Sequence, residues 1–447
     1  MKSDTLYSKF QQSLQRLHLV PGQQLVVALG GGADSQTVLD CLNRFRQANP
    51  QYEYLAIHLD HHFHPQSPAW AKTIKGSVES YGMASHFEDL TFIEKNRVSK
   101  EAMGRERRYQ RLAELTADNA IILLGQHRND QIETFLLQLK RGSGPRGLAS
   151  MAEVQPFVGQ RKLVRPLLEV SKQAILKYAH EHQLTWIEDN TNYDTRIERN
   201  YLRHKVIPQL EQRWPQFGQS VLRSAALCAE QDALLDELLA DKLNNAWCSH
   251  AWLNTGLSLT ELAHFSEPLQ RAAIRYWLTH QTGCERMPSQ AQLHQICQQA
   301  LSAANDAKVA VNLASGCVYR FANALWWFEH ADQEMHMSGH RVQLPHPYGE
   351  LVWQLNGARV DENSPVLARL TDLSAELKSI KLYQPERDGG KPIRAWLKQA
   401  RIPWWLREEL PIIRSGSWLW LPGVGWLNEV SGEQPPLIIS MQQGDED

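Results

Sequence analysis

The sequence predicts an α/β protein that begins with a doubly wound parallel sheet, continues in a mainly helical domain and ends in a small α+β domain. Three observations carry this prediction. Apolar runs of strand length recur in the first half of the chain, a helical pattern follows each run, and a glycine triplet separates the first run from its helix. Because 447 residues are too many for one hydrophobic core, we expect domains at 1–215, 216–335 and 345–447.

The strands of the first domain are predicted from continuous apolar runs, which are typical of parallel sheets covered on both faces. These runs lie at 25–29, 54–59, 120–125 and 162–168. The helix after the second run begins at Ser67-Pro68, since serine caps a helix and proline suits its first turn. A further helix is predicted over 171–183. Repeated strand–helix units of this kind place ligands at the carboxyl ends of the strands.

The rest of the chain has weaker signals. One long helix is expected over 217–243, helical sequence to about residue 302, and short strands over 309–329. The polar segment 330–345 predicts a linker. Tryptophan, proline and short apolar runs in the last hundred residues favour a small α+β module.

Composition excludes several classes of protein. No apolar run reaches the roughly 18–20 residues that span a bilayer, and the first residues lack the apolar core of a secretory signal. The six cysteines are far apart, which favours reduced thiols over disulfides or a Cys-x-x-Cys metal site. We therefore expect a cytoplasmic protein without membrane contact. The net charge of −2 hides two basic clusters, within 140–172 and 196–213, which could line a polyanion-binding face or be ordinary solvated surface.

The stretch LGGGADS (29–35) predicts a phosphate site. A strand, a glycine turn and a helix N-terminus together expose backbone N–H groups to an anion, and glycine leaves room for it to approach. Ser35 adds a hydroxyl and Asp34 can hold a phosphate-bound magnesium ion. The spacing is that of neither a Walker A loop nor a dinucleotide fingerprint.

GGGADS resembles the Ser-Gly-Gly-x-Asp-Ser loop of the ATP pyrophosphatase (PP-loop) family, with Gly30 at the usual serine. GQHRNDQIETFLLQLKRGSGPRGLASM (125–151) resembles a signature of the tRNA(Ile)-lysidine synthase family, with Asn129 at the usual aspartate and Gln126 where histidine is frequent. Further segments resemble the same family: 101–109 (EAMGRERRY), 187–208 (IEDNTNYDTRIERNYLRHKVIP) and 389–411 (GGKPIRAWLKQARIPWWLREELP). The ordered motifs cover nearly the whole chain.

The resemblance implies a ligase that uses ATP to join free lysine to C2 of the wobble cytidine of an isoleucine tRNA with a CAU anticodon. It implies three sets of residues. The expected catalytic residues are Asp34, Asp130, Glu133 and Arg105, with Asp34 and Asp130 also expected to hold magnesium. The expected ATP-binding residues are Gly30, Gly31, Gly32, Ala33, Asp34, Ser35 and His58. The expected tRNA contacts are Arg141, Arg146, Arg199, Arg203 and Lys205.

Other interpretations stay open at this stage. A PP-loop enzyme of the 2-thiocytidine type would share the adenylation step but normally carries paired cysteines, and a relative without catalysis would still bind nucleotide or tRNA. The histidines of HLDHHFH (58–64) have the composition of a zinc site, but a strand end beside the nucleotide pocket explains them better. Trp404 and Trp405 are expected in a core rather than stacking on bases. The sequence leaves open whether two copies form a homodimer.

Overall fold

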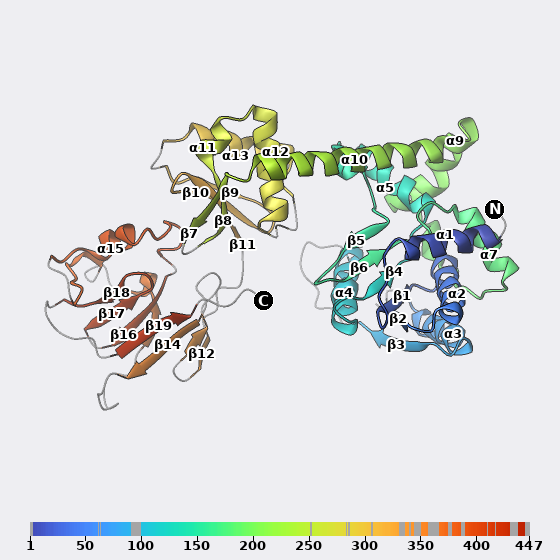
Figure 1. The fold of residues 1–447 in the computed structure, drawn as a ribbon, viewed down its shortest axis with the longest axis horizontal. Helices are drawn as coiled ribbons and strands as arrows, with labels where there is room; N and C mark the ends of the chain where they lie inside the picture. Colours follow the sequence, from blue (N-terminus) through green and yellow to red (C-terminus); the bar gives the residue numbers. More distant parts are fainter. Residues whose placement is uncertain are drawn as a thin grey trace. The chain divides into compact units, whose positions relative to one another are not determined.

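The chain divides into two compact units, Met1–Leu235 and Asp236–Asp447. This computed structural model describes residues 3–60, 62, 64–90, 100–250, 253–282, 284, 287–304, 307–329, 336–338, 341–343, 350–355, 366–373, 378–385, 389–408, 410–415, 417–429 and 437–442. The division falls inside helix α10 (Phe217–Lys242). Figure 1 labels the elements of both units.

The first unit is built on a six-stranded sheet with the order β3-β2-β1-β4-β6-β5. All neighbouring strands are parallel except β5, which pairs antiparallel with β6. The strands are β1 (Gln24–Leu29), β2 (Glu53–Asp60), β3 (Ala84–Asp89), β4 (Ile121–Leu123), β5 (Val154–Pro156) and β6 (Lys162–Val164). The helices of this unit, with two short helical turns, are α1 (Ser3–Gln15), α2 (Ala33–Ala48), α3 (Ser67–Ser80), α4 (Lys100–Leu115), α5 (Arg128–Lys140), α6 (Pro145–Leu148), α7 (Lys172–Glu181), η1 (Asn190–Tyr193), α8 (Glu198–Tyr201), the π-helical η2 (Leu202–Val206) and α9 (Ile207–Arg213).

The packing of strand β1 explains its continuous run of apolar residues. Leu25 and Val27 point to the core formed with α1, α2, α3 and α7, while Val26 points to a second core that includes Leu112 of α4. Both faces of the sheet are therefore covered, and the successive side chains of Leu25, Val26 and Val27 are fully buried. This arrangement confirms the predicted doubly wound sheet (Figure 1).

The strand order places a ligand crevice beside β1. From β1 the chain proceeds outward through β2 and β3, and then crosses to the other side of β1 to form β4. The loops that follow β1 and β4 consequently diverge at the carboxyl end of the sheet. In open parallel sheets, this topological switch point is where ligands bind.

The second unit holds a five-stranded sheet, β7-β8-β11-β10-β9, and two four-stranded sheets, β12-β13-β14-β19 and β15-β16-β17-β18. Its strands are β7 (Trp247–His250), β8 (Leu253–Ser258), β9 (Ala310–Asn312), β10 (Gly316–Phe321), β11 (Ala324–Glu329), β12 (His336–Ser338), β13 (Arg341–Gln343), β14 (Glu350–Leu355), β15 (Val366–Arg369), β16 (Pro411–Ser415), β17 (Trp418–Leu421), β18 (Gly425–Leu427) and β19 (Leu437–Gln442). Its helices are α11 (Leu259–Ala263), α12 (Glu267–His280), α13 (Gln290–Ser302), the 3₁₀ turn η3 (Leu370–Asp372) and α15 (Ile393–Gln399). One core surrounds Trp277 of α12 and a second surrounds Trp396 of α15.

Three predictions differ from the structure. The segment 330–345 is not only a linker, because β12 and β13 lie in it and pair into a sheet through β14. Strands β7 and β8 precede the helices of the second unit, since β8 gains backbone partners from β11. Helix α3 is capped by Gln66, one residue before the expected start. In the described part of the chain, no helix is long and apolar enough to cross a bilayer, and all six cysteines are free thiols.

Candidate active site

The loop after β1 turns sharply at Gly31. Its φ of +88° is a conformation that residues with a Cβ rarely adopt, and a Cβ there would lie 2.8 Å from Ile187 Cδ1. The Gly31 carbonyl accepts a hydrogen bond of 2.9 Å from the Ile187 amide. The segment resembling the family at 187–208 therefore fixes the loop from outside the sheet.

The same loop opens the N-terminus of α2 to a ligand. A Cβ at Gly30 or Gly32 would meet no atom within 4 Å, and the N-cap Gly32 offers no side-chain cap. The first-turn N–H groups and the helix dipole therefore favour an anion at this point. Ser35 Oγ accepts from the Gly31 amide at 3.1 Å and donates to the Gly32 carbonyl at 3.0 Å, so the hydroxyl holds the loop in shape.

The loop after β4 is organised by His127, which caps α5. Its Nδ1 accepts from the Asn129 amide at 3.2 Å, while its own amide donates to Asp130 Oδ2 at 3.0 Å. Because Nδ1 accepts, Nε2 carries the proton. Nε2 lies 3.5 Å from both Asp34 Oδ1 and Asp130 Oδ2. One buried imidazole thus links the two carboxylates that come from the two sides of the switch point.

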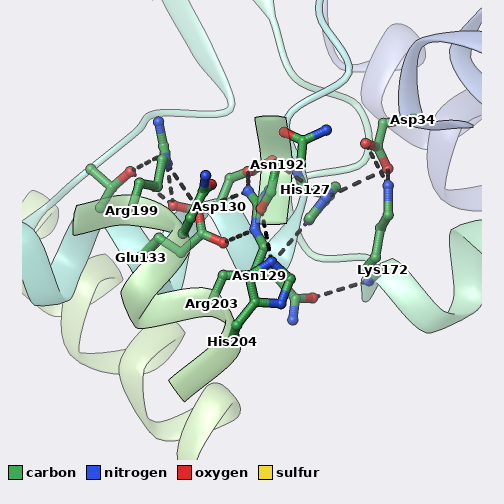
Figure 2. Close-up of polar contacts among 12 residues, drawn as sticks. Asp34, His127, Asn129, Asp130, Glu133, Lys172, Asn192, Arg199, Arg203 and His204 are labelled. Atoms are coloured by element: carbon green, nitrogen blue, oxygen red, sulfur yellow. Dashed lines mark hydrogen bonds and ion pairs between the residues drawn. The ribbon is translucent and has the colours of Figure 1, made fainter. Parts of the chain in front are cut away.

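Lys172, the first residue of α7, neutralises Asp34. Its Nζ lies 2.8 Å from both carboxylate oxygens of Asp34. The start of α7 is held in place because the Lys172 amide donates to Asn129 Oδ1 at 3.0 Å. Asn129, at the usual aspartate of the resembled motif, therefore joins α5 to α7. Figure 2 shows these contacts running from Lys172 through Asp34 and His127 to Asp130.

Glu133 anchors two arginines. Its side chain is fully buried, and it accepts from Arg199 Nε at 2.8 Å and from Arg203 Nε at 2.6 Å and Nη2 at 3.0 Å. Arg203 also reaches Asp130 Oδ1 at 3.3 Å. Burial lowers the pKa of Arg203, but the hydrogen bonds and charges of Glu133, then Asp130 and Asp34, outweigh it and raise that pKa. Glu133 consequently acts as the counter-ion of this cluster (Figure 2).

Asp34, Asp130 and Arg199 line one cavity of about 560 Å³ within the first unit, whereas His127, Lys172, Glu133 and Arg203 are not part of its lining. Its lining contains Gly30, Gly32, Asp34 and Ser35 on one side and Asp130, Thr134 and Arg199 on the other. Arg105 of α4, predicted from the resemblance, also lines it. Gln126 lines it too, and its buried Oε1 accepts no hydrogen bond from any residue that the structure describes. The volume suits a nucleotide-sized ligand.

Of the other predicted residues, His58, Arg141, Arg146, Arg203 and Lys205 are not part of the cavity lining. His58 of β2 is buried, and its Nδ1 donates to the Leu29 carbonyl at 2.8 Å, so it supports the strand that leads into the glycine loop. Arg146 pairs with Asp232 at 2.8 Å. Arg141 and Lys205 are exposed. Arg199 and Arg203, predicted to contact tRNA phosphates, are the two arginines that hold Glu133.

Sequence reasoning missed two members of this site. The sequence places Lys172 only within a predicted basic cluster, and it assigns no role to His127. A signal was available for His127, since a residue at the N-cap position three before Asp130 forms a capping box. No signal was available for Lys172, because its partner Asp34 lies 138 residues away.

The zinc hypothesis for HLDHHFH falls partly on residues 61 and 63, which lie outside the described residues. Of the described residues, Asp60, His62 and Asp89 come together at the paired ends of β2 and β3. His62 Nδ1 lies 3.4 Å from Asp60 Oδ2 and Nε2 lies 3.1 Å from Asp89 Oδ1. The ring bridges two carboxylates, an arrangement that ion pairing explains without a metal.

Trp404 and Trp405, both expected in a core, differ in environment. Trp405 stacks on Tyr319 with ring centroids 4.2 Å apart and packs against the core around Trp396. Trp404 instead lines a cavity of about 340 Å³ with Lys308, Arg394 and Arg407.

Comparisons with known proteins find matches of the same family in three segments of the chain and over nearly its whole length. Residues 4–210 match the PP-loop domain, residues 257–326 the TilS substrate binding domain and residues 375–439 the TilS substrate C-terminal domain. The tRNA(Ile)-lysidine synthase of Idiomarina loihiensis is 54% identical over 432 residues, which cover 96% of this chain and 93% of that protein. The corresponding enzymes of Vibrio campbellii and Escherichia coli O157:H7 are 36% and 34% identical, each over 92% of this chain and over 93% and 94% of their own lengths.

Proposed function

Because this chain belongs to the tRNA(Ile)-lysidine synthase family, we propose that it joins the ε-amine of free lysine to C2 of the wobble cytidine of an isoleucine tRNA with a CAU anticodon. The reaction consumes ATP and releases AMP and pyrophosphate. The observation that supports it is a single cavity bordered both by an anion-binding glycine loop and by a carboxylate–arginine cluster.

The reaction needs ATP because it proceeds in two chemical steps, adenylation of the base and then attack by the amine. Cytidine O2 attacks the α-phosphorus, the bond to the β-phosphate oxygen breaks, and pyrophosphate leaves. The ε-amine of lysine, after losing a proton, attacks C2, and the C2–O2 bond breaks as AMP departs with O2. Oxygen at C2 is a poor leaving group until it is bonded to phosphorus, so adenylation must come first.

The residues of the glycine loop bind the phosphates of ATP. The backbone amides of Gly32–Ser35 and the dipole of α2 face the departing pyrophosphate, while the Gly31 amide holds the loop through Ser35. Lys172, now held by Asp34, supplies a cation that can turn toward the phosphates when nucleotide enters. Arg105 and Arg199 line the same cavity and add positive charge.

The carboxylates bind the second substrate, free lysine. Asp130 lines the cavity with its side chain 16% exposed, and we assign it the ammonium group of the incoming lysine. That ammonium group has a pKa near ~10.4 in water, so it must give up a proton before the amine attacks. Glu133 and the two arginines keep Asp130 in place from the protein side.

The site also fits magnesium. Asp34 and Asp130 both line the cavity, one on each side of the switch point, and offer the hard oxygen donors that this ion prefers. When bound, the ion would neutralise charge on the triphosphate. Asp34 and Asp130 would hold it.

The tRNA would extend beyond the first unit. The second unit carries the two segments that match substrate-binding domains, and we propose that 216–335 and 345–447 contact the tRNA body while Arg141, Arg146 and Lys205 contact phosphates near the anticodon. We further propose that the protein works in the cytoplasm. A homodimer stays a prediction that sedimentation of the full chain would test.

The test incubates the full chain with radiolabelled lysine, ATP, magnesium and a transcript of the isoleucine tRNA with a CAU anticodon. Lysine label in RNA, in amounts equal to AMP, is expected. A transcript with a GAU anticodon and the Asp34→Asn variant are the controls, and both should stay unlabelled. Transfer of sulfur from a donor would instead support the 2-thiocytidine type, and nucleotide binding with no turnover would support a relative without catalysis.

A further inference from the structure

Tyr193 is an aromatic side chain left open to solvent in the chain segment that also supplies Arg199 and Arg203. It is 64% exposed and ends the short turn η1. Its ring stacks on that of His204, with centroids 5.4 Å apart and planes 22° from parallel. His204 directly follows Arg203, whose Nε lies 2.6 Å from Glu133. The stacked pair therefore lies one residue from the arginine that holds the cluster together.

The loop that carries Tyr193 is rigidly held from both ends. Asn200, only 7% exposed, donates to the Thr191 carbonyl at 2.9 Å and to the Asp194 carbonyl at 3.1 Å. Asp189 accepts from the Thr191 amide at 2.8 Å. Because these bonds fix the backbone on either side of Tyr193, little entropy is lost when a ligand stacks on its ring.

His204 is oriented as well. Its Nε2 donates to the Asn192 carbonyl at 2.9 Å, so the imidazole backs the tyrosine ring instead of rotating freely. His204 lies in the π-helical segment η2, just before Pro208. Proline has no N–H to complete the helix, and π-helical turns occur often at functional sites. The pair is thus built by a local departure from regular helix.

The charge around the pair suits a polyanion. Lys205 and Arg213 are exposed on the same helical run, and Arg199 lines the cavity. An exposed aromatic ring, stacked on a histidine of a helical run that also carries exposed cations, is a combination with which proteins bind single-stranded nucleic acid.

We propose that Tyr193, backed by His204, is the stacking platform for the unpaired base next to the wobble cytidine. This inference rests on the proposed function, which requires that cytidine to leave the anticodon stack and enter the cavity. The neighbouring base loses its stacking partner when the cytidine leaves, and the Tyr193 ring replaces that partner. The platform would thereby hold the anticodon open during both chemical steps.

A spectroscopic test isolates the stacking itself. An anticodon stem-loop RNA carries 2-aminopurine in place of the anticodon adenine, and its fluorescence falls when the base stacks. Binding to the full wild-type chain should quench this fluorescence, Tyr193→Ala should abolish the quenching, and Tyr193→Trp should restore it. Trp214→Ala, which removes another exposed aromatic ring of the first unit, should leave quenching intact. Equal quenching in Tyr193→Ala and wild type would overturn the inference.

Kinetics separate this inference from the proposed function. Tyr193→Ala should raise KM for the tRNA by roughly 5- to 150-fold, the effect of one lost base–aromatic stack, while KM for ATP and for lysine stays unchanged. Wild type that forms no lysidine would refute the proposed function. Wild type that forms lysidine together with an unchanged tRNA KM in Tyr193→Ala would refute the platform alone.

Discussion

Replacing Glu133 by glutamine is the sharpest perturbation of the carboxylate–arginine cluster. The change keeps the shape of the side chain and one carbonyl oxygen but removes the charge that Arg199 and Arg203 share. The Glu133 side chain is fully buried, whereas the two arginine side chains are 36% and 33% exposed. The arginines can therefore turn partly to water, but the buried amide then faces two cations.

Breaking a buried ion pair by removing one partner costs about 3–5 kcal/mol. We expect the lower end, about 3 kcal/mol, because the arginines are partly solvated and Arg203 keeps Asp130 at 3.3 Å. For a unit of this size that loss lowers the melting temperature by about 6–12 °C. The loss should fall on the first unit, whose melting transition ATP would shift upward.

Differential scanning calorimetry of the full chain measures this loss. Glu198→Gln is the matched control, because its carboxylate is 60% exposed and its ion pair, among the described residues, is with the exposed Lys140. The control should have the same melting temperature as wild type. The rate of tRNA-dependent AMP formation should fall in Glu133→Gln alone. If both variants melted together, the interpretation of Glu133 as a buried counter-ion would be wrong.

Three further predictions concern the residues around the glycine loop. Lys172→Met should reduce AMP formation by more than about tenfold, since a charged contact contributes about 1.5–3 kcal/mol. Lys177→Met on the same helix should leave the rate of AMP formation unchanged. Equal rates in Lys172→Met and wild type would refute the role of Lys172. Gly31→Ala should lower the free energy of unfolding by about 1–3 kcal/mol because of the positive φ at Gly31 and the contact of the new Cβ with Ile187. Gly30→Ala, whose Cβ would meet no atom within 4 Å, should leave the stability unchanged. Chemical denaturation compares the two variants. Burial lowers the pKa of His58 against the opposing bond to the Leu29 carbonyl, so the unfolded chain binds more protons and stability falls as pH drops below about 6.5. The melting temperature of His58→Gln should depend less on pH over that range, and identical profiles would contradict this.

Much of the fold could be predicted from the sequence because buried parallel strands consist of continuous apolar residues. Strands β4 and β6 fall within predicted runs, and β1 and β2 contain theirs with one extra residue at one end of β1 and at both ends of β2. Strand β3 was missed because ASHFED is largely polar, and it lies at the edge of the sheet with few buried side chains. Strands β12 and β13 were missed for a related reason: three-residue strands show no periodicity, and their pairing depends on β14.

The candidate site was predictable where local sequence encodes it. A glycine triplet at a strand end and two acidic residues three apart on a helix are local patterns, and the structure brings Asp34, Asp130 and Glu133 to one region. The partners of these carboxylates were not predictable. Lys172 reaches Asp34 only because α7 packs against α2, and Arg199 and Arg203 meet Glu133 only through the tertiary fold. Charge pairing across elements has no signature in a single sequence.

The most direct measurement follows the oxygen that leaves the cytidine. A tRNA carrying ¹⁸O at O2 of the wobble cytidine is incubated with the full chain, ATP, magnesium and lysine, and the AMP is analysed by mass spectrometry. If the glycine loop holds the triphosphate while O2 attacks the α-phosphorus, the heavy oxygen appears in AMP, one atom for each lysine joined. AMP without the label, alongside lysidine in the RNA, would show that ATP activates another group and would contradict the mechanism.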